Sequence, residues 1–454
     1  MHSGRGRLDV AHKPKINYAN FLMNLSEETL SRQGIRRGDW QLMANMNRNL
    51  VVNVLRTRPT MSRADLVRAT RLSGPTVSSI VADLCQRGLV EELGQGFSSG
   101  GRPPSLLRLN DKANYVLGLK LMGHAVSLVI TDLRATVVYT QVSPLPEQVA
   151  AREGPTPTPV PRDPLLTIEA IAQAIELALS SSGIAADRMI GVGIGIAGAV
   201  DAHSGICRFS NMFNWHNVAL AQPLSERLGL PVILENDANA LTAAEQWFGP
   251  GHGVDHFIVI VVGSGIGAGI VVNGQLHRGA DGAAGEFGHI QLGDAGPACT
   301  CGQRGCVEAW ASDRAILRDI RDAIAQGRPT SLMGAADAGD LTIARVGAAA
   351  DQGDELSRDV LSRAGEYLGR GAVAIINVIN PRLVIISGEG VPAGEWRFGP
   401  VRKAIGSSTF AGTNTEVVLV SEPVDGAKWA RGAACVVLGE MFNPPTKHSL
   451  VAVM

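Results

Sequence analysis

The spacing of hydrophobic residues near the start of the chain predicts three short helices in succession. Four apolar residues share one face of the first helix, which should end near Pro59: Leu50, Val51, Val54 and Leu55. Ser62 followed by Asp65 is typical of a capping box at the start of the second helix. Ser73 and Pro75 indicate the start of the third helix, whose buried face should consist of Val77, Ile80, Val81 and Leu84.

Two short hydrophobic segments, residues 89–93 and 105–109, follow the helices and are predicted to be strands joined by a Gly- and Ser-rich loop. A helix, a helix-turn-helix and a β-hairpin form the order of a winged-helix domain, which we assign to residues 46–110. A generic small helical domain is the alternative. In a DNA-binding domain, the N-terminal part of the third helix would contact base edges or phosphates. The candidates there are Ser73, Thr76, Ser78 and Ser79.

The loop of the predicted hairpin contains the sequence Gly100-Gly101-Arg102-Pro103. Glycine and proline on either side of one arginine hold that arginine on a narrow extended strip. Such a strip resembles the core of an AT-hook, which enters a narrow A/T-rich minor groove. Arg102 is therefore a further DNA-binding candidate, with a plain linker as the alternative.

The charge distribution adds weight to the DNA-binding interpretation. The chain has 454 residues and a formal net charge of −1. Residues 1–110 contain 14 Arg and 2 Lys against 8 acidic residues, an excess of +8, whereas the remainder carries −9. A basic part joined to an acidic body is typical of a polyanion-binding module, although a solvated basic face would have the same composition. Residues 1–45 have weak periodicity and are predicted to be a basic arm.

Residues 111–442 have the pattern of an α/β body in which buried strands end in Gly-rich or polar turns. Strands are predicted at residues 115–121, 126–132, 190–196, 232–234, 257–262, 268–272 and 383–386, and an amphipathic helix at 166–180. We expect a doubly wound fold with ligands at the strand ends. The Pro-rich segment 144–164 should be an exposed loop, and residues 443–454 a C-terminal tail.

Composition excludes several classes of protein. Hydrophobic residues make up 45% and charged residues 18%, which rules out wholesale disorder. The longest uncharged apolar run, residues 257–272, is interrupted by four glycines and is not predicted to cross a membrane. The N-terminus lacks the apolar core of a signal peptide. We therefore expect a cytoplasmic protein.

The strongest chemical signal is a group of one histidine and three cysteines: His289, Cys299, Cys301 and Cys306. One imidazole and three thiolates are a closed tetrahedral zinc set, and a zinc ion with four protein ligands is structural. Chance clustering of free thiols is the alternative. Glu286 and Glu308 lie close to this group in the sequence, and two carboxylates can accept hydrogen bonds from vicinal sugar hydroxyls.

Three motifs together resemble a known family. They are Gly285-Glu-x-Gly-His289, the run CxCGQxGCxE from Cys299 to Glu308, and Glu235-Asn-Asp-Ala-Asn239. They resemble the ROK family of bacterial sugar kinases and sugar-responsive repressors, over about residues 47–442. The resemblance implies an actin-like, two-lobed ATPase fold and a homodimer or tetramer. The winged helix in front resembles the repressor branch.

The resemblance also implies roles for individual residues. Asn236 and Asp237 would bind sugar hydroxyls, and Asp237 would be the catalytic base in a kinase. The remaining hydroxyls would be bound by Glu286, His289 and Glu308, with His289 oriented by its bond to zinc. Gly198 would line the same pocket. The phosphate and nucleotide loops would contain Gly263, Ser264, Gly265, Gly267 and Gly388.

One stretch departs from the kinase pattern. The kinases carry a first phosphate loop, Asp-x-Gly-Gly-Thr, whose aspartate helps to hold Mg²⁺ and whose glycines let phosphate approach. The aligned stretch here is residues 118–124, with Lys120 in the place of that aspartate and Met122 and His124 in the turn. A lysine cannot ligate Mg²⁺. We therefore expect sugar binding to persist, and phosphoryl transfer with ATP and Mg²⁺ to be lost or very weak.

We interpret the chain as a sugar-responsive transcriptional regulator, most simply a repressor of carbohydrate metabolism genes. Its partners would be double-stranded operator DNA and a small sugar or sugar phosphate, and it would be found in the bacterial cytoplasm with the nucleoid. Two alternatives stay open. One is an active ATP-dependent sugar kinase with a fused DNA-binding domain, which Asp237 and the glycines of residues 263–267 support. The other is a regulator controlled by a protein partner.

Overall fold

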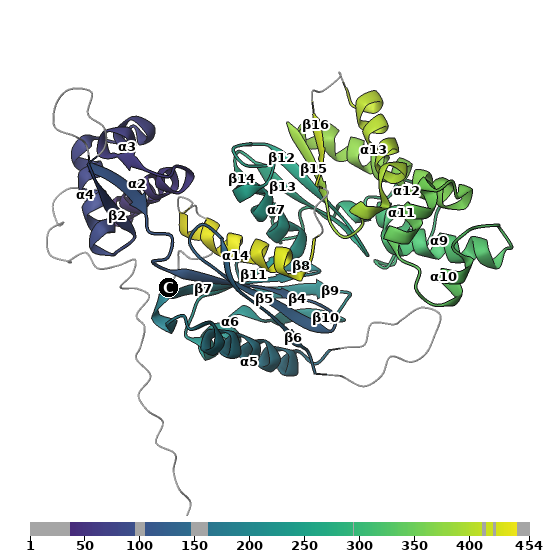
Figure 1. Cartoon of the computed structure of the whole chain (residues 1–454), viewed down its shortest axis with the longest axis horizontal. Coiled ribbons are helices and arrows are strands. Elements are labelled where there is room, and N and C mark those ends of the chain that lie inside the picture. Colours follow the sequence, from purple (N-terminus) through teal and green to yellow (C-terminus); the bar gives the residue numbers. More distant parts are fainter. Residues whose placement is uncertain are drawn as a thin grey trace, which may run out of the picture.

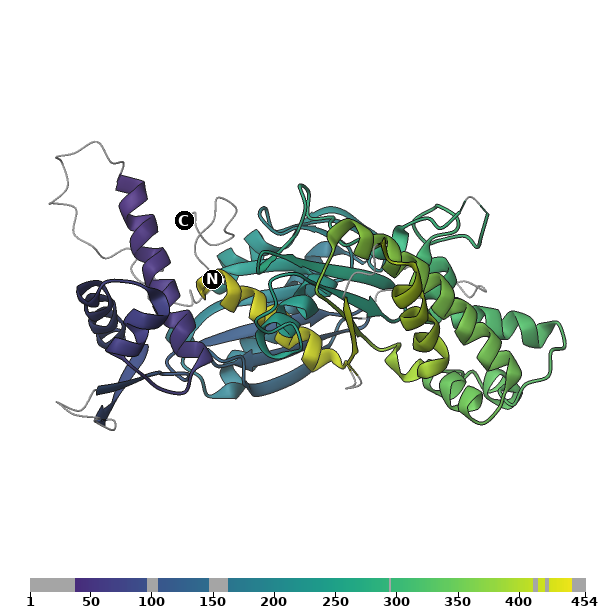
Figure 2. The same cartoon turned by 90° about the horizontal axis from the view of Figure 1, so that it is seen from above.

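The computed structural model describes residues 37–95, 105–146, 162–293, 295–410, 415–420 and 424–442. Within this part, the chain forms a winged-helix domain at one end and a larger body of two lobes (Figure 1). Seen from above, the winged-helix domain and the helices of the second lobe occupy opposite ends of the elongated molecule (Figure 2). The predicted wing residue Arg102 and the tail 443–454 fall outside the described residues.

The N-terminal domain has the predicted winged-helix order. Its elements are α2 (Arg37–Thr57), β1 (Met61–Ser62), α3 (Arg63–Thr70), α4 (Gly74–Gln86), β2 (Val90–Gln95) and β3 (Ser105–Leu109), with strand order β1-β3-β2. Both predicted caps form, since Ser62 and Asp65 make a capping box on α3 and the Ser73 side chain accepts from the Thr76 N–H. α2 already begins at Arg37, so the end of the segment predicted to be an arm is helical.

The first lobe is a five-stranded mixed sheet with strand order β11-β7-β4-β5-β6. Its elements are β4 (Tyr115–Leu121), β5 (Ala125–Thr131), β6 (Val137–Pro144), α5 (Pro164–Ser182), β7 (Met189–Ile196) and β11 (Val232–Asn236). A small sheet and a helix are inserted between β7 and β11: β8 (Ala199–Asp201), β9 (Ile206–Ser210), β10 (Trp215–Ala219) and α6 (Ala221–Leu228).

The second lobe repeats the topology of the first. Its strands are β12 (Phe257–Val262), β13 (Ile266–Val272), β14 (Gln275–Leu276), β15 (Leu383–Ser387) and β16 (Glu416–Leu419), in the order β14-β13-β12-β15-β16. In the first sheet the central strand β4 is antiparallel to β5 and parallel to β7. In the second sheet the central strand β12 is likewise antiparallel to β13 and parallel to β15. This duplicated arrangement is the predicted actin-like, two-lobed fold.

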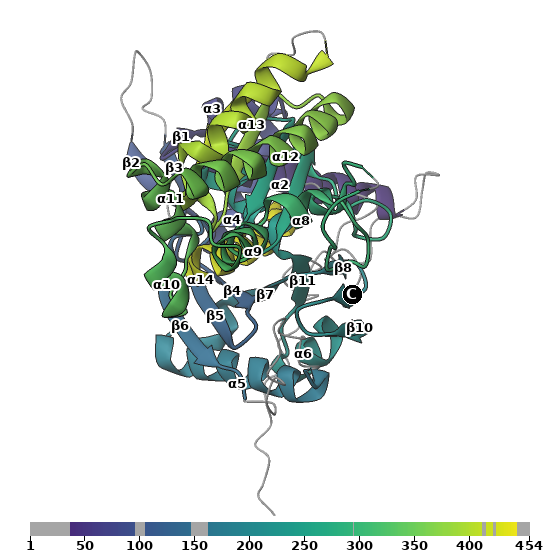
Figure 3. The same cartoon turned by 90° about the vertical axis from the view of Figure 1, so that its right-hand side faces the viewer.

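Helices form one side of the second lobe (Figure 3). They are α8 (Val307–Ala311), α9 (Asp313–Ala325), α10 (Met333–Asp337), α11 (Ile343–Asp351), α12 (Glu355–Ile379) and α13 (Glu395–Ser408). In Figure 3, α9, α11, α12 and α13 lie above the first-lobe strands. Short 3₁₀ turns occur at Ala186–Arg188, Phe287–His289 and Val391–Ala393. The middle turn contains His289, which the sequence marks as a metal ligand.

Two helices, α7 (Asp237–Phe248) and α14 (Gly426–Phe442), pack against each other. α14 also contacts the first-lobe sheet and α2 of the winged-helix domain, and α7 contacts β12 and β13 of the second lobe. α14 lies directly on the first-lobe sheet. A Cβ atom at Gly118 would lie 2.0 Å from the Ala430 carbonyl oxygen, so only glycine permits this approach. At its other end, α14 reaches the winged-helix domain, where the Asn53 side chain donates to the Phe442 carbonyl over 2.6 Å.

One helix of the described residues, α5, is long and apolar enough to cross a membrane by length and composition alone. Its residues Ile171, Ile175 and Ala178 are buried in the core of the first lobe. In this fold α5 therefore packs one face against the first lobe, and 33% of its apolar window is buried.

Candidate functional site

Two of the residues predicted to bind a sugar, Asn236 and Gly198, meet where the first-lobe strands end. Asn236 closes β11 and caps α7, since its side-chain oxygen accepts from the Asn239 N–H over 3.2 Å. Its amide nitrogen donates to the Gly198 carbonyl over 2.8 Å. Gly198 has a φ of 136°, and a Cβ there would lie 2.2 Å from the Phe209 carbonyl oxygen. Glycine is therefore required in this wall of the site.

Asp237, the first residue of α7, forms an ion pair that the sequence did not predict. Its Oδ2 lies 2.6 Å from Nζ of Lys120, which projects from β4. The lysine side chain is 9% exposed and that of Asp237 22% exposed. The position expected to affect only Mg²⁺ binding thus supplies a cation directly to the predicted catalytic base.

The four predicted metal ligands form one compact group. The ligand atoms of His289, Cys299, Cys301 and Cys306 all lie within 4.8 Å of one another. The loop folds back on itself, because the Cys299 N–H donates to the Gln303 carbonyl and Gly302 and Gly305 adopt positive φ. Three sulfur atoms and one imidazole at this spacing fit a tetrahedral ion such as Zn²⁺.

Thiol acidity in this group is uneven. Burial acts to raise the pKa of Cys299, but hydrogen bonds with His289 and Cys301 outweigh it and lower the pKa to about 7. Burial and the neighbouring thiols raise the pKa of Cys306 to about 12. Contact with Cys299 raises the pKa of His289. Since metal ligands are deprotonated, binding of a metal would release protons from these groups.

The two nitrogens of His289 face different partners. Nδ1 lies 3.5 Å from the Cys299 sulfur, and Nε2 lies 3.7 Å from Oε2 of Glu286. Burial raises the pKa of Glu286, and the nearby carboxylates Asp237 and Glu308 raise it further. His289 therefore connects the metal group to the carboxylates of the predicted sugar site.

Glu308, in the first turn of α8, links two loops. One is the loop 299–306 that carries the three cysteines, which we call the metal loop, and the other is the Gly-rich turn between β12 and β13. Its Oε2 accepts from the Ile266 N–H over 3.0 Å. Its Oε1 accepts from the Thr300 hydroxyl and from Arg314, each over 3.1 Å. Arg314 also donates to the Ser264 carbonyl over 2.6 Å, so it is a residue of the site that no sequence motif indicated.

The predicted phosphate and nucleotide residues lie together at the corresponding end of the second-lobe sheet. Gly263, Ser264 and Gly265 form the turn from β12 to β13, in which the Gly263 N–H donates to the Gly265 carbonyl over 3.0 Å, and Gly267 is the second residue of β13. Gly388 follows β15 with a φ of 120°, and a Cβ there would lie 2.2 Å from the Val262 carbonyl oxygen.

The candidate DNA contacts occupy the N-terminal part of α4. Ser73, Ser78 and Ser79 are exposed and Thr76 is half-buried. The Thr76 hydroxyl lies 2.7 Å from that of Ser73. Ser73 and Thr76 therefore also shape the helix cap, which the sequence predicted only for Ser73.

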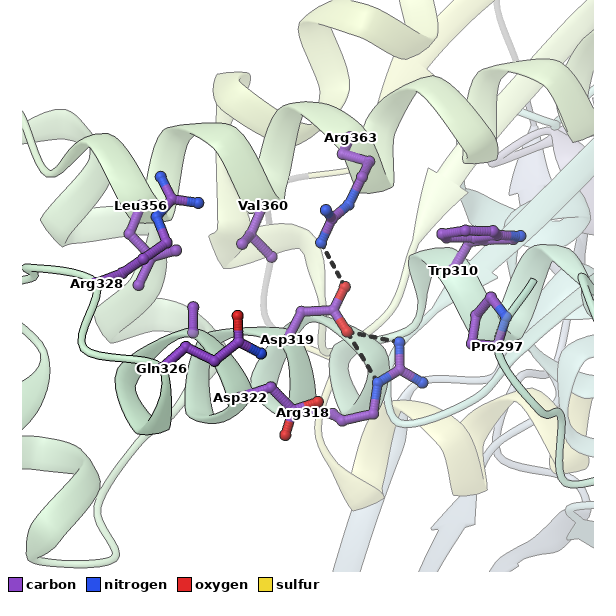
Figure 4. A pocket seen from close by; sticks show the side chains of 11 residues that line it. Pro297, Trp310, Arg318, Asp319, Asp322, Gln326, Arg328, Leu356, Val360 and Arg363 are labelled. Atoms are coloured by element: carbon purple, nitrogen blue, oxygen red, sulfur yellow. Dashed lines mark hydrogen bonds and ion pairs between the residues drawn. The ribbon is translucent and has the colours of Figure 1, made fainter. Parts of the chain in front are cut away.

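A separate pocket lies between α9 and α12, next to Trp310 and Pro297 (Figure 4). Asp319 occupies its middle and forms ion pairs with Arg318 over 2.7 Å and Arg363 over 2.6 Å. None of the predicted site residues lines this pocket.

Comparison with known proteins agrees with this architecture. A model of the ROK family matches residues 117–440, and one of the MarR family matches residues 50–95. A solved ROK family transcriptional regulator, described as a homologue of the E. coli MLC protein, superposes with a TM-score of 0.77 at 25% identity. The match covers 88% of this chain and 98% of that one.

Two curated relatives, a repressor and a kinase, differ in how much of this chain they match. A xylose repressor from Caldicellulosiruptor bescii is 27% identical over 408 residues, which are 90% of this chain and 99% of the relative. A glucokinase from Thermotoga maritima is 39% identical, but over 251 residues that cover 54% of this chain and 78% of the enzyme. A winged helix joined to a sugar-kinase-like body defines a class of DNA-binding regulators. The chain belongs to the ROK family, and it shares the full domain arrangement of the family's repressors.

Proposed function

We propose that the protein is a sugar-responsive transcriptional repressor of carbohydrate metabolism genes. The observation that carries this proposal is the single helix α14, which contributes Trp429 beside the cleft residue Lys120 and Phe442 to the contact with α2. Sugar binding and DNA binding would thus act on the same element. The winged helix would bind operator DNA, and the cleft would take a small sugar or sugar phosphate, in the bacterial cytoplasm at the nucleoid.

The effector sugar would lie between Asp237 and the metal group. Asn236, Asp237, Glu286 and Glu308 offer acceptors for sugar hydroxyls, and the Glu286 side chain is 46% exposed. Zn²⁺ bound by His289 and the three cysteines would act only as a structural ion. With Nδ1 facing the sulfur atoms, His289 would keep Nε2 for Glu286 and the sugar.

Phosphoryl transfer is not expected from this cleft. A kinase base must accept the proton of the attacking hydroxyl, and Asp237 instead holds the Lys120 ammonium over 2.6 Å. The same ammonium stands where Mg²⁺ would need a carboxylate ligand. An ion-paired carboxylate still accepts hydrogen bonds, so this arrangement favours binding without turnover.

The response to sugar would travel through α7 and α14. Closure of the lobes on a sugar would shift these packed helices, and α14 contacts α2 of the winged-helix domain. In a homodimer or tetramer, such a shift would change the separation of the two recognition helices, α4, on a palindromic operator. The sugar must bind the two arrangements with different affinity to alter DNA binding.

Substitution of the sugar-site carboxylates tests this proposal. Asp237→Ala and Glu286→Ala should each abolish the effect of the sugar on operator binding, while the affinity for operator DNA without sugar stays within about twofold. Asp187→Ala removes an exposed carboxylate of the same lobe and serves as the matched control. Fluorescence anisotropy with labelled operator DNA, with and without a panel of sugars, measures both effects. Loss of DNA binding in Asp237→Ala with zinc still bound would contradict the two-site account.

A sugar kinase is the second candidate, and it is supported by Asp237 and the glycines of residues 263–267, to which the family resemblance assigns roles in such an enzyme. The two candidates differ in turnover. Sugar-dependent release of ADP at about 1–100 s⁻¹, the ordinary range for kinases, would support the kinase and contradict our proposal.

A further inference from the structure

A carboxylate lies on the Gly-rich turn to which the family resemblance assigns phosphate binding. Glu389 follows Gly388 at the end of β15, and its Oε1 accepts from the Trp429 indole N–H over 2.9 Å. A Cβ atom placed on Gly263 would lie 2.5 Å from the other oxygen, Oε2. The Glu389 side chain therefore fills the space above the first glycine of the turn between β12 and β13.

The backbone that carries Glu389 is firmly held. The Gly390 N–H donates to the Val262 carbonyl over 2.8 Å, and the fully buried Arg397 donates to the Gly390 carbonyl over 3.1 Å. Arg397 also forms an ion pair with Asp313 over 2.7 Å. A change that frees the turn from Glu389 would therefore have to rotate the side chain away from Trp429.

Trp429 connects Glu389 to the ion pair in the first lobe. The Lys120 ammonium lies 4.9 Å from the centroid of the Trp429 ring, on the face of the indole, and 2.6 Å from Asp237. Asp237, Lys120, Trp429 and Glu389 thus form a continuous series of contacts from the first lobe to the second. Its charges alternate in sign, with one cation between two carboxylates.

We propose that this series is a built-in substitute for a magnesium nucleotide, in which Glu389 takes the space of a phosphate and Lys120 supplies the cation. A phosphate group approaching Gly263 would meet a carboxylate of the same charge, which the Trp429 indole holds at the turn although the residue is exposed to solvent. The cleft would therefore exclude nucleotides and bind its sugar without them. The inference rests on the proposed function in that it specifies how the sugar site works.

The test is direct titration of the full-length protein with Mg²⁺-AMPPNP in a calorimeter. Glu389→Gln keeps the shape of the side chain but removes its charge, and Glu389→Gly removes both. The matched control is Glu395→Gln, which removes a carboxylate that pairs with Arg402 on the surface of α13. Far-UV circular dichroism and the zinc content establish that each variant is folded.

We expect the wild type and Glu395→Gln to bind Mg²⁺-AMPPNP only weakly, and Glu389→Gly to bind it at least tenfold more tightly. A gain in Glu389→Gln as well would assign the exclusion mainly to charge, and a gain confined to Glu389→Gly would assign it to the space that the side chain fills. Tight binding by the wild type, or folded Glu389 variants without a gain, would overturn the inference.

Titration with a sugar panel in the presence and absence of Mg²⁺-AMPPNP forms the second arm. The inference predicts that the sugar affinity of the wild type is the same in both conditions, within about twofold. If no sugar binds to any variant, the proposed function fails, whereas the nucleotide titration still tests the role of Glu389. The two failures are therefore distinguishable.

Discussion

At the scale of single residues, the cleft depends on how its charges are paired. Lys120 lies 2.6 Å from Asp237, and the Glu308 carboxylate accepts hydrogen bonds from Ile266, Thr300 and Arg314. A carboxylate that holds a cation still accepts hydrogen bonds, but the cation occupies the oxygen that would take the proton of an attacking hydroxyl. One ion pair can therefore separate sugar binding from catalysis.

The buried ion pair of Arg397 and Asp313 predicts a large effect on stability. The Arg397 side chain is fully buried and its partner 11% exposed, so Arg397→Met would leave an unpaired buried carboxylate. We expect the free energy of unfolding to fall by about 3–5 kcal/mol. Arg402→Met, which breaks the exposed pair with Glu395 on the same helix, should cost at most about 1 kcal/mol. Urea denaturation measures both, and equal losses would contradict this assignment.

Single residues could be predicted from the sequence only where a local motif contained them. Asp237 and His289 lie in short motifs, and the structure brings both into one region. The contact between Trp429 and Glu389 spans 40 residues, and that between Arg397 and Asp313 spans 84. Pairs at such separations are created by the fold and leave no signal in the local pattern.

At the scale of elements, the group of His289 and three cysteines predicts that a bound metal stabilises the loop that carries it. Removal of the metal by a chelator, or Cys301→Ser, should lower the melting temperature and weaken sugar binding more than tenfold. His289 would lose its bond to the metal, and Glu308 would lose the hydrogen bond from Thr300 of the same loop. The affinity for the metal should also fall as the pH falls, since the Cys306 thiol, with its pKa raised to about 12, must lose its proton to bind.

Zinc analysis, differential scanning fluorimetry and sugar titration measure these effects. Cys85→Ser, a change outside the ligand group, is the control. If the protein binds sugar with unchanged affinity after a chelator has removed the metal, the metal loop does not support the sugar site.

The cap of α12 predicts a pH dependence. Although burial acts in the opposite direction, hydrogen bonds from Ser331 and Ser357 lower the pKa of Asp354 below its ordinary value. The cap therefore contributes stability above about pH 4, the ordinary value for aspartate, and loses it as the pH falls through the lowered pKa.

We expect Asp354→Ala to reduce the free energy of unfolding by about 1–2 kcal/mol at pH 7, and by less at pH 3. Thr342→Ala at the cap of α11 removes an uncharged cap and should have the same effect at both pH values. Urea denaturation at pH 7 and pH 3 measures these losses. A loss of unfolding free energy in Asp354→Ala that is equal at the two pH values would contradict a cap that depends on the ionised Asp354 carboxylate.

Most strands could be predicted from the sequence because their buried residues form continuous apolar runs. The predicted strand 115–121 coincides with β4, and 257–262 with β12. The strands β6, β9 and β10 were not predicted, because their exposed polar positions break the apolar run. The first half of α2 was not predicted either, because its polar residues interrupt the helical spacing of apolar positions.

At the scale of the whole molecule, the winged-helix domain and the first lobe share one hydrophobic core. Val51 and Leu55 of α2, Val116 of β4 and Phe442 of α14 belong to the same cluster. The Arg56 guanidinium also lies 4.0 Å from the centroid of the Trp247 ring at the end of α7. The DNA-binding domain is therefore attached to the helices that lie beside the cleft.

This attachment could not be predicted from the sequence. The Asn53 side chain and the Phe442 carbonyl are 389 residues apart, and no periodicity relates them. The repeated topology of the two sheets was implied by the family resemblance, whereas the packing of α14 on Gly118 and Gly193 depends on the assembled fold.

The most direct test of the account is the affinity of the purified protein for the DNA upstream of its own gene, measured at fixed salt with and without a sugar panel. We predict tight binding to a palindromic site and a change of at least tenfold with one sugar. Weak binding that is lost at modest salt and does not respond to any sugar would contradict a sugar-responsive repressor.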